Sequence, residues 1–452
     1  MKKLCLLFIF LSSVIVLASF ENSEIQGIVQ GTATEAIDGV VYQYAMIPGR
    51  EKEICITKIT SNQSVVSIPS QISGNTVTTI GAGELDYDDC PREERELLSA
   101  PRSDAGEKLK KTYRVLQENS QVKKIVIPQT VKWIKMCAFY ESASIQDVTL
   151  SKGLLEIGSE AFGGCTGIRK VVIPQSVQTI WDSFAGCTGI KKVVVNSEKV
   201  QIGARAFQGI TGKVVFASKK TQNMQDIFFQ WANNPKKVSS VTWKKGLKKI
   251  EVAEGTFDYS RIRNLIVPPS VKTFTMWQQE MMLCDYLVVT GKDTKVSKDT
   301  IMGHDEGAYY INAKANVAQK GSKVLKYASK FKRPQIEKLD VNDEDDVMLL
   351  EDNGHYTESN VGMKKVKVIS INPPSRVSVT RSRNKLSWSQ GKNISEYWIY
   401  YAEKKGGPYK KIATTKTGKY IAKKSGYYRV KGIKEAYGFP WKGKNSRTIK
   451  VS

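Results

Sequence analysis

The stretch VKKIVIPQTVKWIKMCAFYESAS (122–144) is followed by three close copies of itself. The copies are IQDVTLSKGLLEIGSEAFGGCTG (145–167), IRKVVIPQSVQTIWDSFAGCTG (168–189) and IKKVVVNSEKVQIGARAFQGITG (190–212). Each unit has 22 or 23 residues, so one single-residue change in length aligns all four. A fixed period of this size is typical of proteins that stack one structural unit on the next.

Apolar residues recur at the same places in every unit and predict the shape of each coil. The columns are Val122, Ile145, Ile168 and Ile190; Ile125, Val148, Val171 and Val193; Ile127, Leu150, Ile173 and Val195; Ile134, Ile157, Ile180 and Ile202; and Phe139, Phe162, Phe184 and Phe207. Residues two apart on a strand share a face, so the second and third columns predict a short strand with inward aliphatic side chains. No single unit can enclose these side chains, so the fold class we expect is mainly β, a solenoid of short parallel strands.

The same alternation places other side chains on the outer face of the predicted sheet. One outward row is Lys124, Asp147, Lys170 and Lys192, and the next is Val126, Thr149, Val172 and Val194. Lysines on such a face can simply keep an exposed sheet soluble and discourage edge pairing. Repeat proteins also commonly bind partners along extended faces of this kind. The candidate ligand-binding face is therefore Lys124, Lys170, Lys192, Val126, Val172 and Val194.

The repeated units resemble a known family, the BspA-type leucine-rich repeats of bacterial surface proteins. VVIPQSVQTI (171–180) and EIGSEAFGGCTGI (156–168) carry the resemblance, and weaker copies extend it over roughly residues 40–333. A charged, helix-prone insertion at 84–121 and an irregular segment at 217–240 interrupt it. The resemblance implies a leucine-rich-repeat solenoid over 21–333, binding to host or neighbouring-cell proteins, and no catalysis.

The C-terminal segment 373–452 has a different pattern of short alternating strands. It contains KLSWS, EYWIYYAE, YKKIATT and GYYRVKGI. Six or seven strands in about 80 residues predict a small antiparallel β-sandwich. The segment resembles a fibronectin type III domain, which implies core positions for Trp388, Tyr428 and Val430.

The N-terminus predicts export. Lys2 and Lys3 precede an apolar run and small residues at 18–19, the pattern of a secretory signal peptide over 1–20. We therefore expect a secreted or non-covalently surface-associated protein with no integral membrane segment in the mature chain. Cys165 and Cys187 share a column, so stacking would bring their backbones close enough for a disulfide. The alternative is a pair of free, buried thiols.

Little in the sequence points to catalysis or to a bound cofactor. The only two histidines, His304 and His355, accompany no nucleophile motif and no HExxH. Between the solenoid and the sandwich we expect an acidic linker over 334–372, whose stretch 339–352 resembles a calcium loop but has Asp345 where a glycine is needed. We expect no catalytic residue, metal or cofactor.

Composition agrees with a globular binding protein. The chain has 452 residues, 41% of them hydrophobic, and 69 Lys and Arg against 44 Asp and Glu. A net charge of +25 suits anionic partners. The function we expect is adhesion: binding to extracellular or host surface proteins, with anionic glycans or wall polymers as further partners. Export and the lack of a recognised motif disfavour nucleic acid. Two alternatives remain, a non-catalytic glycan-binding accessory protein of a polysaccharide-degrading system and a secreted hydrolase with its site in 217–310.

Overall fold

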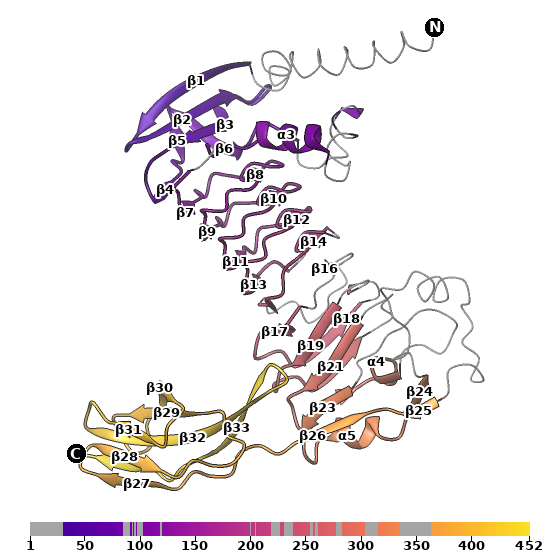
Figure 1. The fold of residues 1–452 in the computed structure, drawn as a ribbon, viewed down its shortest axis with the longest axis vertical. Coiled ribbons are helices and arrows are strands. Elements are labelled where there is room, and N and C mark those ends of the chain that lie inside the picture. Colours follow the sequence, from indigo (N-terminus) through magenta and orange to yellow (C-terminus); the bar gives the residue numbers. More distant parts are fainter. Residues whose placement is uncertain are drawn as a thin grey trace.

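The structure is a computed structural model of the full chain. It describes residues 30–84, 91–92, 94, 96, 103–117, 120–198, 200–203, 205–217, 227–229, 238–253, 256–257, 261–276, 283–302, 315–334 and 363–452. A repeat region winds from the N-terminus toward the sandwich that ends the chain (Figure 1). The mainly β fold predicted from the sequence is confirmed.

Each regular coil contributes one strand to each of two parallel sheets. The first sheet has ten strands. They are β1 (Gln30–Ile37), β2 (Val40–Met46), β3 (Glu53–Thr60), β5 (Gln71–Ile72), β6 (Asn75–Ile80), β8 (Trp133–Ile134), β10 (Glu156–Ile157), β12 (Thr179–Ile180), β14 (Val200–Ile202) and β16 (Ile227–Phe229). β1, β2 and β3 pair antiparallel, and the sheet turns parallel where β3 meets β6.

The second sheet carries the outer face on which the lysines were predicted. It has eight strands: β11 (Lys170–Ile173), β13 (Lys192–Val195), β15 (Lys213–Phe216), β17 (Ser240–Trp243), β19 (Arg261–Val267), β21 (Leu283–Val289), β23 (Ala315–Gln319) and β26 (Val368–Ile371). The preceding coils form a separate three-stranded sheet of β4 (Val65–Ser67), β7 (Lys124–Val126) and β9 (Asp147–Thr149). All eleven pair in parallel within their groups.

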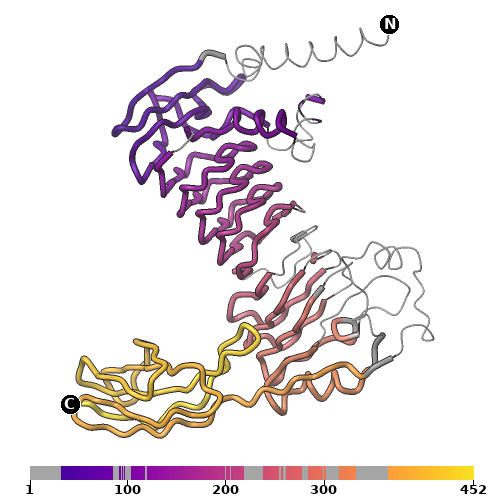
Figure 2. The backbone as a smooth tube through the Cα atoms, viewed as in Figure 1, coloured from indigo at the N-terminus to yellow at the C-terminus, as the bar shows by residue number. Residues whose placement is uncertain are grey.

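The later coils have a third sheet and short helices. The sheet consists of β18 (Lys249–Val252), β20 (Thr273–Met276) and β22 (Lys295–Val296), and the helices are α4 (Lys298–Met302) and α5 (Lys323–Ala328). One hydrophobic core runs continuously from Val40 to Val366. The stacked coils are visible as successive turns of the tube in Figure 2.

The predicted apolar columns stack as successive layers of this core. The phenylalanine column is the clearest case, since the ring centroids of Phe139 and Phe162, of Phe162 and Phe184, and of Phe184 and Phe207 lie 5.1, 5.1 and 5.5 Å apart. Their rings are within 12° of parallel. This spacing is close to the separation of paired strands, so strand pairing sets the stacking distance. Leu150 alone among the aliphatic columns is only partly buried.

Buried polar groups bridge one coil to the next. The thiols of Cys165 and Cys187 donate to the carbonyl oxygens of Phe139 and Phe162, with S···O distances of 3.0 and 2.9 Å. Both cysteines are buried and free, which agrees with the thiol alternative of the sequence analysis. Each of these carbonyl oxygens also accepts a backbone N–H within its own coil, so the thiol adds a second hydrogen bond that joins one coil to the next.

We expect Cys187 to resist alkylation in the folded protein. Burial raises the pKa of its thiol to about 12, so only about one molecule in ten thousand carries the reactive thiolate at pH 8. Peptide mass spectrometry after iodoacetamide treatment should find Cys187 unmodified in buffer and modified in urea. Modification without denaturant, or a disulfide to Cys165, would contradict this assignment.

Glycines mark two different places in each turn. Gly164, Gly186 and Gly209 have φ of +69°, +73° and +84°, the left-handed conformation that favours glycine. Gly189 is needed for a different reason, since a Cβ there would lie 2.0 Å from the carbonyl oxygen of Thr166. The backbones of adjacent coils touch at this point.

The predicted helix-prone insertion contains a helix packed on the solenoid. α3 (Asp104–Thr112) lies beside the first regular coils (Figure 1). Its Lys110 is buried, and Nζ lies 3.1 Å from Glu160 Oε1. Burial alone would lower the pKa of Lys110, but the charges of Glu160 and Glu107 outweigh it and raise the pKa. A charge buried this deeply requires its partner, so the ion pair fixes the helix in place.

The C-terminal module folds as two antiparallel sheets around its own core. The first sheet has β27 (Val379–Ser382), β28 (Lys385–Trp388) and β31 (Lys419–Ile421). The second has β29 (Glu396–Ala402), β30 (Lys410–Thr415), β32 (Gly426–Ala436), β33 (Phe439–Asn445) and β34 (Ile449–Val451). Trp388, Tyr428 and Val430 lie in the core as predicted. The assignment to fibronectin type III stays a prediction.

Part of the predicted linker is structured. β24 (Lys332–Pro334) pairs with β25 (Met363–Lys365), and β26 joins the second solenoid sheet. The segment 363–371 therefore belongs with the repeat region rather than with a linker. The signal peptide, His304, His355 and the stretch 339–352 lie outside the described residues. Within the described part of the chain, no helix has the length and apolar character needed to cross a membrane.

Candidate functional site

A row of lysines lies in register on the outer face of the second sheet. Lys170 of β11 pairs with Lys192 of β13, which pairs with Lys213 of β15. All three are exposed. Among the described residues, no acid forms a salt bridge with any of them. Their backbones are about 4.8 Å apart, so the row is a closely spaced line of positive charge.

A row of valines runs beside the lysines. Val172, Val194 and Val215 pair in the same ladder and are half-buried. The two rows give the face a charged stripe next to an apolar one. We name this surface, Lys170, Lys192, Lys213, Val172, Val194 and Val215, the repeat face.

The structure changes the set of residues predicted for this face. Lys124 lies on the same side of the solenoid, but its Nζ is 3.2 Å from Asp147 Oδ2, so its charge is compensated. Val126 is half-buried beside it on β7. Lys213 was missed, although the run KVVF at 213–216 repeats KVVI and KVVV of the preceding strands. This repeated run was the sequence signal that could have placed Lys213 in the lysine row.

The C-terminal module covers the far end of this same face. The hairpin of β32 and β33 turns at Tyr437 and Gly438, whose φ values are +54° and +71°. Two consecutive left-handed residues make the tight turn typical of two-residue hairpins. Its Tyr437, Phe439 and Trp441 pack in a separate apolar cluster with four side chains of the solenoid, Ile266, Val288, Val317 and Ile371.

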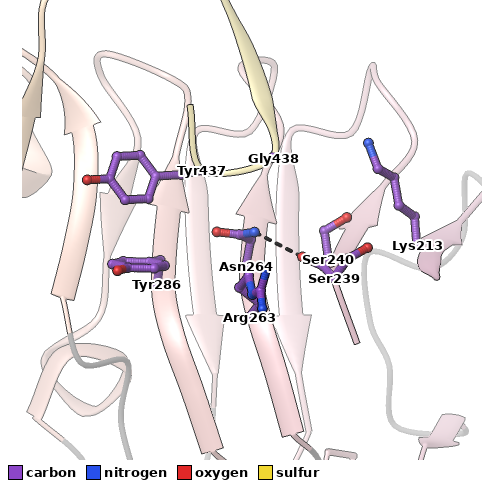
Figure 3. Close-up of a pocket in the computed structure, with 8 residues that line it drawn as sticks. All are labelled: Lys213, Ser239, Ser240, Arg263, Asn264, Tyr286, Tyr437 and Gly438. Carbon is purple, nitrogen blue, oxygen red and sulfur yellow. Dashed lines mark hydrogen bonds between the residues drawn. The ribbon is translucent and has the colours of Figure 1, made fainter. Parts of the chain in front are cut away.

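A pocket lies where the repeat face meets the hairpin. It has a volume of about 410 Å³ and is lined by Lys213, Ser239, Ser240, Arg263, Asn264, Tyr286, Tyr437 and Gly438 (Figure 3). The Tyr437 ring stands edge-on to Tyr286, with centroids 4.7 Å apart. Sequence reasoning missed this pocket, because its two walls are far apart in the chain and share no periodic signal.

The polar groups of the pocket are only partly satisfied within the protein. The side-chain amide of Asn264 donates to the Ser239 carbonyl oxygen at 2.9 Å, while its own Oδ1 is buried without a partner. Burial raises the pKa of Glu435 on β32, and Glu396 raises it further, whereas Lys213 opposes this shift. The sandwich thus brings an acid within electrostatic reach of the end of the lysine row.

The chemistry that these residues provide is recognition. The repeat face and the pocket supply cations, hydroxyls, one amide and aromatic edges. Within the described ranges, no group of three His, Cys, Asp or Glu side chains is placed to hold a metal. Cations beside apolar and aromatic surface suit a partner that is acidic at its edge and apolar at its centre.

Comparison with known proteins identifies the repeat. A family model described as the BspA type Leucine rich repeat region matches residues 113–236 and 181–279 in 6 copies. Residues 113–279 therefore match the BspA-type leucine-rich repeat, which supports the sequence resemblance over that part of the repeat region. A comparison with curated proteins gives no match.

Solved structures of leucine-rich repeat proteins are similar to this chain. One from T. pallidum is 20% identical, with a TM-score of 0.30, and the match covers 58% of this chain and 86% of that one. A leucine rich cell surface protein from Faecalibacterium prausnitzii is 13% identical (TM-score 0.23; 65% and 90% covered). The pneumococcal vaccine antigen PcpA is 11% identical (TM-score 0.25; 75% and 99% covered).

Proposed function

We propose that this protein is exported and acts as an adhesion protein, binding host or neighbouring-cell proteins through the repeat face. Repeat proteins of this kind interact with other proteins, and the matched family is typical of bacterial surfaces. The observation that carries the proposal is the in-register row of Lys170, Lys192 and Lys213 beside three half-buried valines. Like charges in register repel one another, and only the Lys213 end of the row has an acid, Glu435, within electrostatic reach, so an acidic partner would relieve the repulsion.

The lysine and valine rows together favour a protein over a glycan or wall polymer as the partner of the repeat face. The valine row gives the apolar centre that protein interfaces need, and the lysines give a charged margin that steers association. Lys124 and Val126 extend the proposed face toward the N-terminus, with Asp147 reducing the charge there. Non-catalytic binding of glycan by the same face is the competing proposal.

Reversing the charge of the row should weaken partner binding without unfolding the protein. For Lys170→Glu, Lys192→Glu and Lys213→Glu combined, we expect binding to an acidic matrix protein to weaken at least about tenfold at low salt. The melting temperature should change little, because all three side chains are exposed. Surface plasmon resonance against a panel of matrix proteins at two salt concentrations measures the effect.

Two comparisons make this experiment decisive. Lys124→Glu should have a smaller effect than any single change in the row, because Asp147 already neutralises Lys124. Val194→Ser should weaken binding at both salt concentrations, since it removes apolar contact rather than charge. Unchanged affinity of the triple variant would refute the proposal. Binding to a neutral glycan array but to no protein would favour the competing one.

A further inference from the structure

A second group of cations lies on the outer face of the sandwich, around a single tryptophan. In the sheet order β30, β29, β32 and β33, Trp398 pairs with Lys431, and Tyr400 pairs with Lys411. Lys411 Nζ lies 3.6 Å and Lys442 Nζ 5.0 Å from the centroid of the Trp398 ring. Two ammonium groups therefore share one indole, and we call Trp398, Lys411, Lys431 and Lys442 the tryptophan–lysine cluster.

The solenoid adds a further positive charge to this cluster. Lys245, exposed in the loop that follows β17, is within electrostatic reach of Lys442 on the sandwich. Burial lowers the pKa of Lys442, and the charges of Lys245, Lys431 and Lys411 lower it further. Docking of the sandwich therefore brings like charges together from two parts of the chain.

The protein places two carboxyl groups, Glu396 and Glu435, near these lysines, fewer than the cations there. Within the described residues, none of these four lysines forms a salt bridge. Glu396 accepts a hydrogen bond from the Trp398 indole instead. Burial and the charge of Glu396 raise the pKa of Glu435, whereas the charges of Lys213 and Lys411 lower it, so this carboxyl is within electrostatic reach of the cluster. Like charges held together in this way cost stability, and an external anion would remove that cost.

We infer that the tryptophan–lysine cluster, together with Lys245, binds a linear polysaccharide whose sugars carry carboxylate or sulfate groups. Lys411 Nζ and Lys442 Nζ lie on the same Trp398 ring, and Lys431 Nζ lies 5.5 Å from the centroid of the Tyr400 ring. The cluster is thus a compact site for one acidic group. The like charge of Lys245 on the solenoid gives a polymer with repeated charges a second point of attachment. This inference is independent of the proposed repeat-face function, because it concerns a different surface.

Other polyanions fit the same residues less well. Nucleic acids bind proteins by stacking bases on open aromatic faces and through arginine forks. Here an ammonium group already lies over the indole, and the four cations are lysines. Protein partners require an apolar centre, but the centre of this cluster is covered by charge. Lysine ammonium groups act as point charges, which suit separate carboxylate and sulfate groups on a flexible chain.

The test is binding of the full chain to two immobilised probes, heparin and polygalacturonate. Lys411→Gln combined with Lys442→Gln should weaken binding about tenfold at low salt and reduce its salt dependence. Lys385→Gln combined with Lys419→Gln removes the same charge from the exposed side of the other sheet. This control should change binding less than about twofold. Heparin binding alone would identify sulfate as the recognised group, and binding to both probes would identify carboxylate.

Further variants separate this site from folding and from the repeat face. Lys411→Arg combined with Lys442→Arg should restore binding, because it keeps the charge. The Lys170, Lys192 and Lys213 triple variant should still bind the polysaccharides. Equal losses in the cluster and control pairs, no binding to either probe at low salt, or tighter binding of an oligo-dT strand to the same cluster would each overturn the inference.

Discussion

Phe184→Ala is expected to lower the free energy of unfolding by about 3–5 kcal/mol. Phe184 is fully buried and stacks on both Phe162 and Phe207, with ring centroids 5.1 and 5.5 Å away. Removing its ring leaves a cavity between two layers that strand pairing keeps at a fixed separation, so the core cannot collapse into it. Urea denaturation followed by far-UV circular dichroism measures the loss.

Val194→Ala in an adjacent coil serves as the matched control. Val194 is half-buried on the outer face, so its truncation should cost no more than about 1 kcal/mol. Similar losses for Phe184→Ala and Val194→Ala would show that the phenylalanine column does not stabilise the solenoid in the way its packing indicates.

Gly189→Ala should destabilise the same coils by about 3 kcal/mol, although it adds a single methyl group. The new Cβ would lie 2.0 Å from the Thr166 carbonyl oxygen and 2.9 Å from that of Ile168. Both are backbone atoms that lie about one turn earlier in the chain, so they cannot rotate away. The coils must therefore separate locally, which weakens the hydrogen bonds between them.

Gly406→Ala tests whether the effect comes from contact rather than from loss of glycine itself. A Cβ at Gly406 would have no atom within 4 Å, so this change should alter stability by less than about 0.5 kcal/mol. Calorimetry of both variants gives the comparison. A melting temperature for Gly189→Ala equal to that of the parent would mean that adjacent coils do not touch there.

Periodicity explains which parts of the fold could be predicted from the sequence. Ile125, Val171 and Val193 were assigned to the core because an aliphatic residue recurs at this position in every unit. Each unit therefore gives further evidence that the position is buried. Lys213 belongs to the same column, but its unit follows the four most regular copies and was left out. Lys124 was assigned to the free lysine row, although its position opposite Asp147 in the next unit allowed the ion pair to be foreseen.

The junction with the sandwich could not be predicted in this way. Asn264 and Gly438 meet in the pocket although well over a hundred residues separate them in the chain. Taken alone, Asn264 is a polar residue on a strand and Gly438 is a glycine in a hairpin turn, so neither residue indicates a pocket. Their contact depends on how the two modules pack against each other. This packing produces no repeating residue pattern in the sequence of either module. The tryptophan–lysine cluster lies within the sandwich, and only its proximity to Lys245 of the solenoid depends on this docking.

Because the regular coils stack in register, the solenoid could gain or lose whole repeat units, and its length would change by one coil for each unit. Deleting residues 168–189 would join two units that carry aliphatic and phenylalanine side chains in the same buried columns, so the flanking layers could stack in the same way. The molecule would become shorter by one strand spacing, about 4.8 Å. Gain or loss of whole units would thus move the C-terminal module nearer to or farther from the N-terminal strands, while leaving the chemistry of each remaining layer unchanged.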